Sequence, residues 1–145
     1  MRLNGKGVID LPVKLMVIVI IVSLSVPMLA GAVERGEVNA AFSAMNAETD
    51  KLFGSAAAVH YSGIGSSRTV QMNLPDGCEI SIPGGDGSDG YSVKFFFKGN
   101  NVGTRYMDRP PVLFISDGIT ISGSCMLFVT SDIHNGHAAV KVTSL

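Results

Sequence analysis

The stretch Leu15–Val33, LMVIVIIVSLSVPMLAGAV, contains 19 consecutive residues and no charged side chain. As an α-helix it would be about 28 Å long, close to the roughly 30 Å hydrocarbon core of a bilayer. Inside that core no water is present to bond the backbone, so a membrane-crossing segment of this kind has to be helical. The sequence therefore predicts a membrane helix near the N-terminus.

The charges differ on the two sides of this apolar run. Arg2, Lys6 and Lys14 precede it, whereas Glu34 and Glu37 follow it together with an arginine. Because basic residues tend to stay on the cytoplasmic side, we expect a cytoplasmic N-terminus and an extracellular C-terminal part. The formal net charge of the chain is −1. This balance argues against nucleic acid as a partner, since nucleic-acid binders concentrate basic residues in a patch.

The N-terminus is open to three interpretations. Ala30-Gly31-Ala32 has the small-x-small pattern of a secretory cleavage site, which would remove the apolar run. Alternatively, Lys6-Gly7 lies ahead of the run, and cleavage there would retain the run in the mature protein. A third interpretation is an uncleaved signal anchor.

The Lys6-Gly7 pair and the apolar helix behind it resemble archaeal type IV pilin-like proteins, which carry a class III signal peptide. The resemblance implies cleavage between Gly7 and Val8 by a prepilin-type peptidase, with the apolar helix as the element that joins other pilin-like subunits. It assigns residues 1–7 to a leader and 8–33 to the transmembrane or assembly helix. It further implies a cell membrane location with an extracellular C-terminal domain, or incorporation into a surface filament.

Residues 34–61 predict a second, amphipathic helix. Apolar residues recur at three- and four-residue spacing on one side, namely Val38, Ala41, Phe42, Met45, Leu52, Phe53 and Ala56. A sheet domain that needs a cover can use such a face. The glycine-rich stretch that follows, from Ser62, ends the helical pattern.

Residues 62–145 predict seven or eight short strands, which indicate an antiparallel β-sheet or a small sandwich, and an α+β fold for the whole chain. Asp117-Gly118 predicts a hairpin between strands at 112–116 and 119–122. The runs at 95–97 and 126–129 predict strands buried on both faces. The residues expected to point inward are Val70, Met72, Ile80, Ile82, Phe95, Phe97, Val112, Phe114, Ile121, Leu127, Val129 and Val140.

Cys78 and Cys125 are the two cysteines of the chain. Both fall in predicted strands of a domain expected outside the cell, where thiols oxidise. A disulfide between them is the prediction, and two buried free thiols are the alternative.

Two further groups of residues are of a type that can bind a metal ion. Residues 84–90, GGDGSDG, match part of the calcium-binding nonapeptide repeat, but a single copy favours a polar hairpin loop, with Asp86 and Asp89 as the calcium candidates. His134 and His137 flank Asn135-Gly136, which favours exposed turn residues over a metal site. We expect no cofactor.

The chain contains no nucleophile motif of the G-x-S-x-G type and no phosphate-loop lysine, so we expect no enzyme. The favoured hypothesis is a non-catalytic pilin-like structural protein, a minor or accessory subunit of an archaeal type IV pilus-like filament. The alternative is a secreted or membrane-anchored extracellular binding module that uses its glycine-rich loops.

Overall fold

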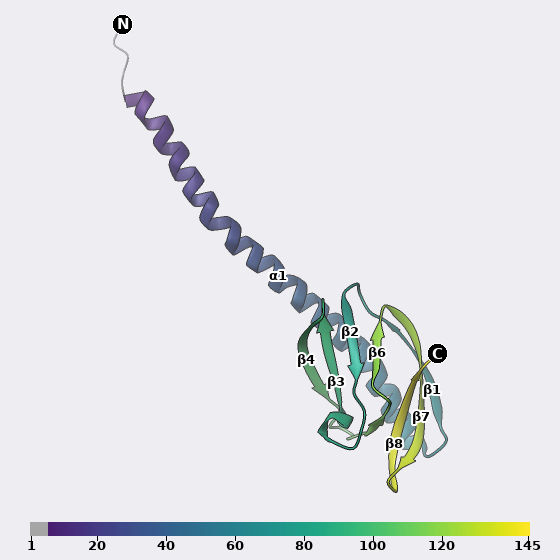
Figure 1. Cartoon of the computed structure of the whole chain (residues 1–145). Coiled ribbons are helices and arrows are strands. Elements are labelled where there is room, and N and C mark those ends of the chain that lie inside the picture. Colours follow the sequence, from purple (N-terminus) through teal and green to yellow (C-terminus); the bar gives the residue numbers. More distant parts are fainter. Residues whose placement is uncertain (1–5) are drawn as a thin grey trace. The chain divides into compact units, whose positions relative to one another are not determined.

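The computed structural model describes the backbone of residues 6–145 and the side chains of residues 10–145. The chain divides into two compact units, residues 1–37 and 38–145. The described part has one α-helix, α1 (Lys6–Ser62), followed by strands and a 3₁₀ helix, η1 (Ser88–Tyr91) (Figure 1). A long N-terminal apolar helix followed by β-sheets is the α+β arrangement that the sequence predicts.

The helix α1 is longer than either predicted helix, because it runs through residues 8–33 and 34–61 without a break. Pro12 and Pro27 both lie inside it. Each removes one backbone donor, which a helix near a membrane tolerates. Gly36 and Gly54 also stay helical, although a mid-helix glycine costs about 1 kcal/mol relative to alanine.

In the first unit, the apolar side chains of α1 are exposed on every side. Between Leu11 and Val33 the large apolar side chains are from 48 % exposed (Val17) to 77 % exposed (Met28). By length and composition, α1 contains a segment able to cross a membrane, and none of its most apolar window is buried. The structure therefore contains a long, exposed apolar helix where the sequence predicts a membrane helix.

The second unit contains two four-stranded sheets. The first sheet has the order β1-β7-β8-β5, and the second sheet has the order β4-β3-β2-β6. The strands are β1 (Ser67–Asn73), β2 (Cys78–Ile82), β3 (Ser92–Phe97), β4 (Asn100–Tyr106), β5 (Phe114–Ile115), β6 (Ile119–Ser122), β7 (Ser124–His134) and β8 (His137–Ser144).

The sheets are antiparallel except for one pair, β5 and β8, which run parallel. The hairpin predicted at Asp117-Gly118 is wrong. Here β5 belongs to the first sheet and β6 pairs with β2 in the second, so this segment crosses between sheets. Gly118 has φ +73°, a conformation that suits any tight change of direction and is not restricted to hairpins.

Two other turns do close hairpins. Lys98-Gly99 joins β3 to β4, and Asn135-Gly136 joins β7 to β8. All four residues have positive φ, the combination of a type I′ turn, whose twist matches that of the flanking strands.

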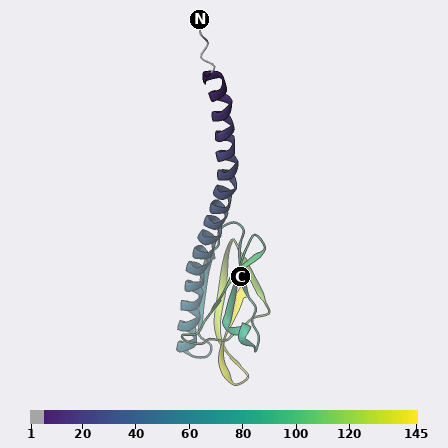
Figure 2. The same cartoon turned by 90° about the vertical axis from the view of Figure 1, so that its left-hand side faces the viewer.

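The core lies between the sheets and the C-terminal part of α1. All the strand residues predicted to point inward are buried except Phe97, which is partly buried against the same cluster. From α1 the cluster takes Ala41, Met45, Leu52, Ala56 and Val59. In Figure 2 this part of the helix lies along the strands of the second unit. The predicted apolar stripe is therefore the face that docks.

Specific contacts fix how the helix docks. The ring of Phe42 meets Phe95 edge-to-face at a centroid distance of 5.5 Å, and it occupies the space where a side chain at Gly103 would project. Arg105 on β4 donates to the backbone oxygen of Asn46 at 3.1 Å and pairs with Asp50 at 2.5 Å. Gly103 and Arg105 of β4 thus contact successive turns of the helix.

The prediction that strand 126–129 is buried on both faces is wrong. Met126 and Phe128 are 45 % and 36 % exposed, whereas Leu127 and Val129 between them are fully buried. The side chains of this strand alternate between core and solvent, as expected for a sheet that is covered on only one face.

Candidate functional site

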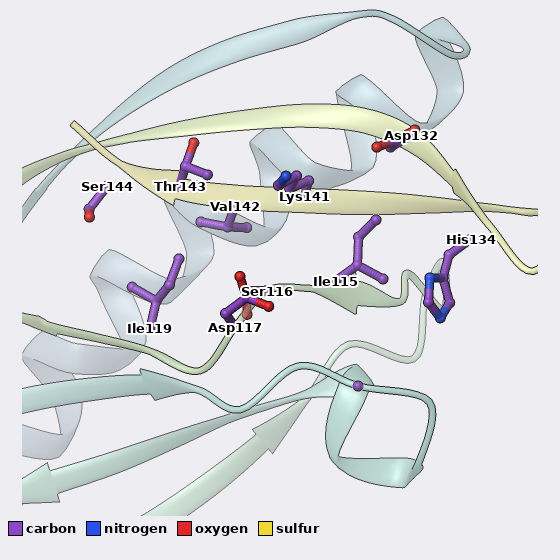
Figure 3. A pocket seen from close by; sticks show the side chains of 11 residues that line it. Ile115, Ser116, Asp117, Ile119, Asp132, His134, Lys141, Val142, Thr143 and Ser144 are labelled. Carbon is purple, nitrogen blue, oxygen red and sulfur yellow. The ribbon is translucent and has the colours of Figure 1, made fainter.

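Two neighbouring cavities lie where the glycine-rich loop 84–90 meets the first sheet. The larger cavity has a volume of about 550 Å³, within the range of small-ligand sites. Its walls include Ser116 and Asp117 from the β5–β6 crossover, Ile119 at the start of β6, and residues 141–144 of β8. Figure 3 shows Ile115, Asp117 and Ile119 on one side of this cavity and the β8 residues on the other.

Two glycines of loop 84–90, Gly84 and Gly90, are required by close packing. A Cβ built at Gly84 would lie 2.2 Å from the backbone oxygen of Ser116, and one at Gly90 would lie 2.1 Å from that of Gly85. A larger residue at Gly84 would push the loop away from the crossover, and one at Gly90 would distort the loop itself. Ser116 further ties the two segments together by donating its hydroxyl to Ile82 O at 3.2 Å. The loop is therefore held against the crossover, and its Gly85 lines the larger cavity.

A smaller cavity of about 490 Å³ lies beside the first. His134 lines both cavities, and its Nε2 pairs with the carboxylate of Asp86. The smaller cavity is also lined by His60 and His137, so all three histidines of the chain reach it. The Nδ1 atom of His60 is buried without a hydrogen-bond partner.

The two calcium candidates do not converge on one site. Asp86 pairs with His134, and Asp89 pairs with Lys94 at 3.2 Å. His134 and His137 face each other as the last residue pair of the β7–β8 hairpin. Among the residues that the structure describes, no three His, Cys, Asp or Glu side chains are placed to hold a metal ion.

The cysteines are free thiols on different sheets. Cys78 lies on β2 of the second sheet and is buried, whereas Cys125 lies on β7 of the first sheet and is half-buried. The structure therefore lacks the predicted disulfide, and of the two free thiols only Cys78 is buried, as the alternative expects. Burial raises the pKa of both thiols, which lowers the thiolate fraction and the reactivity at neutral pH.

The predicted processing residues, Gly7 and Val8, lie in the first turns of α1, and the side chain of Val8 is outside the described residues. The rest of the leader, residues 1–5, is also outside the part of the chain that the structure describes. The structure therefore does not test where the chain is cleaved.

Sequence reasoning found the loop and the histidines but missed the β8 wall of the larger cavity. Residues 141–144 carry ordinary strand residues, Lys-Val-Thr-Ser, with no local signal of a site. Their role depends on β5, which pairs with β8 over only two residues. The sequence does contain one signal. The stretch at 112–118 is short and ends in a turn, which indicates a short strand that would leave part of its neighbour unpaired.

No family model matches the chain, and neither does any curated protein or solved structure. Its function is therefore inferred from its own residues and their arrangement.

Proposed function

We propose that the chain is a pilin-like structural protein of the cell surface, in which residues 8–33 anchor it in the membrane before assembly and join it to neighbouring subunits afterwards. The observation that carries the proposal is the change in α1 along its length. Residues 11–33 expose apolar side chains on every side, whereas residues 41–59 bury one face in the domain core. One continuous helix thus supplies both a stem and a part of the fold.

The exposed stem needs a surrounding that is not water. Burying one methylene removes about 0.8 kcal/mol of unfavourable hydration, and lipid or another stem can provide that burial equally well. In lipid, helices associate through close packing rather than through the hydrophobic effect. We propose that Val17, Ile18, Ile20, Ile21 and Leu24 are lipid-exposed in the single subunit and contact neighbouring stems in an assembly.

Continuity of the helix favours cleavage before the stem over cleavage after it. The secretory site at residues 30–32 lies inside α1, more than two turns from either end of the helix. Cleavage between Gly7 and Val8 would instead leave almost all of α1 in place. This supports a prepilin-type peptidase as the processing partner, and we propose a minor or accessory filament subunit as the product.

The N-terminus of the exported protein tests the proposal. N-terminal sequencing and intact mass should show a chain that starts at Val8. Gly7→Leu should block this cleavage and leave the full precursor in the membrane, because a bulky residue replaces the glycine next to the cut. Gly5→Leu, the same substitution two residues earlier, is the matched control and should be processed. A start at Val33, an intact Met1 in the unaltered protein, or normal cleavage of Gly7→Leu would each contradict the proposal.

A second candidate function is an extracellular binding module. The specific observation in its favour is the pair of cavities beside loop 84–90, both of which are lined by His134. This function is compatible with either secretion or anchoring, and a start at Val33 would favour its secreted form.

A further inference from the structure

The larger cavity is an opening at the edge of the first sheet. Four consecutive residues of β8, 141–144, line it. Successive side chains of a strand point to opposite faces of the sheet, so a cavity over one face would be lined by alternate residues only. A cavity lined by consecutive residues opens at the edge of the strand, and this one also extends over the face of the sheet on which Asp132 and His134 of β7 lie.

The edge is open because β5 is short. Val140 donates its amide to Leu113 O, so even-numbered residues of β8 direct their backbone groups toward β5. The parallel pairing ends at Ile115 with Lys141. Beyond that point, in the described part of the chain, no strand pairs with this side of β8 at Ser144. The amide and carbonyl of Ser144 therefore point toward the cavity.

The opposite wall of the cavity also begins at a free strand edge. β6 is the last strand of the second sheet, and it pairs with β2 alone. Ile119, its first residue, lines the same cavity as β8. Unpaired strand edges of this kind are the usual place where a protein accepts an added strand.

The side chains around the opening indicate the character of an occupant. Ile115, Ile119 and Val142 form its apolar part. Asp117 and Asp132 supply two carboxylates, against one ammonium group from Lys141, and His134 already pairs with Asp86. The excess of carboxylates matches a basic side chain on the occupant.

We propose that this opening binds an extended peptide segment of a partner protein, which adds a strand beside Ser144, inserts apolar side chains between β8 and β6, and places a lysine or arginine near Asp117. A three-residue length of strand spans about 10 Å, which suits an opening bordered by the last residues of β8. The main-chain groups of Ser144 would give affinity, and the apolar and acidic walls would give specificity. The proposal does not depend on how the N-terminus is processed.

The test uses the full chain in detergent micelles and an acetylated, amidated hexapeptide, Thr-Val-Lys-Val-Thr-Val. We expect saturable binding by calorimetry and slower hydrogen exchange at the Ser144 amide when the peptide is present. The same peptide with alternate backbone amides methylated should not bind, because it keeps the side chains but loses the donors. A peptide with glutamate in place of lysine should bind more weakly, because it would meet Asp117 with a like charge.

Two variants at one position separate backbone from side chain. Ser144→Pro removes the amide that faces the cavity and should weaken peptide binding by about two- to tenfold, as expected for the loss of one hydrogen bond. Ser144→Ala keeps that amide and should bind as the unaltered chain does. Both should melt at nearly the temperature of the unaltered chain, since the pairing of β8 with β5 ends at Lys141, before this position.

Three results would overturn the proposal. The first is no saturable binding of the hexapeptide. The second is equal binding by Ser144→Pro and Ser144→Ala, or by the methylated and unmethylated peptides. The third is saturable binding of an oligosaccharide such as maltotriose at this cavity in place of the peptide, which would assign the cavity to a glycan.

Discussion

The two parts of α1 are both helical, but their side chains suit different surroundings. Residues 11–33 are apolar around the whole helix and are exposed throughout, whereas residues 38–62 are amphipathic and bury only one face. Apolarity by itself therefore does not identify the segment that belongs to the domain core. The pattern does, because only a helix with a polar side can cover a sheet and still face water.

The strongest test of this comparison is to remove one part at a time. A chain that begins at Glu34 keeps the docking helix and should be soluble and unfold cooperatively. A chain that begins at Ser66 loses the helix, exposes the inner sheet residues, among them Met72, Phe95 and Phe114, and should aggregate. Size-exclusion chromatography and thermal melting followed by circular dichroism would check both. If the shorter chain is monomeric and melts at the same temperature, the helix is not part of the core.

A matched pair of leucines gives the next largest effect. Leu52 is fully buried and Leu24 is 65 % exposed, and both lie inside α1. Leu52→Ala should lower the free energy of unfolding by about 2–5 kcal/mol, because it leaves a cavity in the core. Leu24→Ala should change it by no more than about 0.5 kcal/mol in detergent micelles.

Urea unfolding of the full chain in micelles, followed by circular dichroism, measures both changes. Equal losses for the two variants would show that the first part of α1 also contributes to the folded core. Equal but negligible losses would show that the docking contacts of Leu52 are not formed in solution.

The same contrast explains what the sequence predicted well. The boundaries of β6 agree with the predicted strand at 119–122, because alternation and turn residues are local signals. The docking face of α1 was also predictable, since its period is carried by adjacent turns of one helix. Pairing partners were not, because Asp117-Gly118 has the same composition whether it closes a hairpin or crosses between sheets.

The candidate site shows the same limit. Loop 84–90 and the His134–His137 turn stood out for their composition, and both do border the cavities. Their partners are far away in sequence: Asp86 meets a histidine 48 positions later. The open edge at Ser144 arises from the shortness of β5, a property of another segment. No reading of residues 141–144 by themselves could reveal it.

The smallest effect is expected from a comparison of two ion pairs, one on each part of α1. Lys14 pairs with Asp10 at 2.7 Å with both side chains exposed, whereas Glu48 is only 12 % exposed and pairs with Lys51 at 2.7 Å. Glu48 also accepts the backbone amide of Asn73 at 3.0 Å, which ties the helix to the end of β1. Burial raises the pKa of Glu48, but the hydrogen bonds from Lys51 and Asn73 outweigh burial and leave the pKa below its ordinary value of 4.5.

A lowered pKa means that the charged form of Glu48 stabilises the fold above pH 4.5, and that this stabilisation is lost as the pH falls through the lowered value. Glu48→Gln should therefore cost about 1 kcal/mol at pH 7, the order of one hydrogen bond, and less in acid, where the unaltered protein has lost the same contribution. Asp10→Asn should have almost no effect at either pH, as is usual for an exposed ion pair. Urea unfolding of the full chain in micelles at pH 7 and pH 3 measures both differences. A loss of stability in Glu48→Gln that is the same at the two pH values would mean that the Glu48 charge does not hold the helix to β1, and that packing by residues such as Leu52 docks this part of α1 alone.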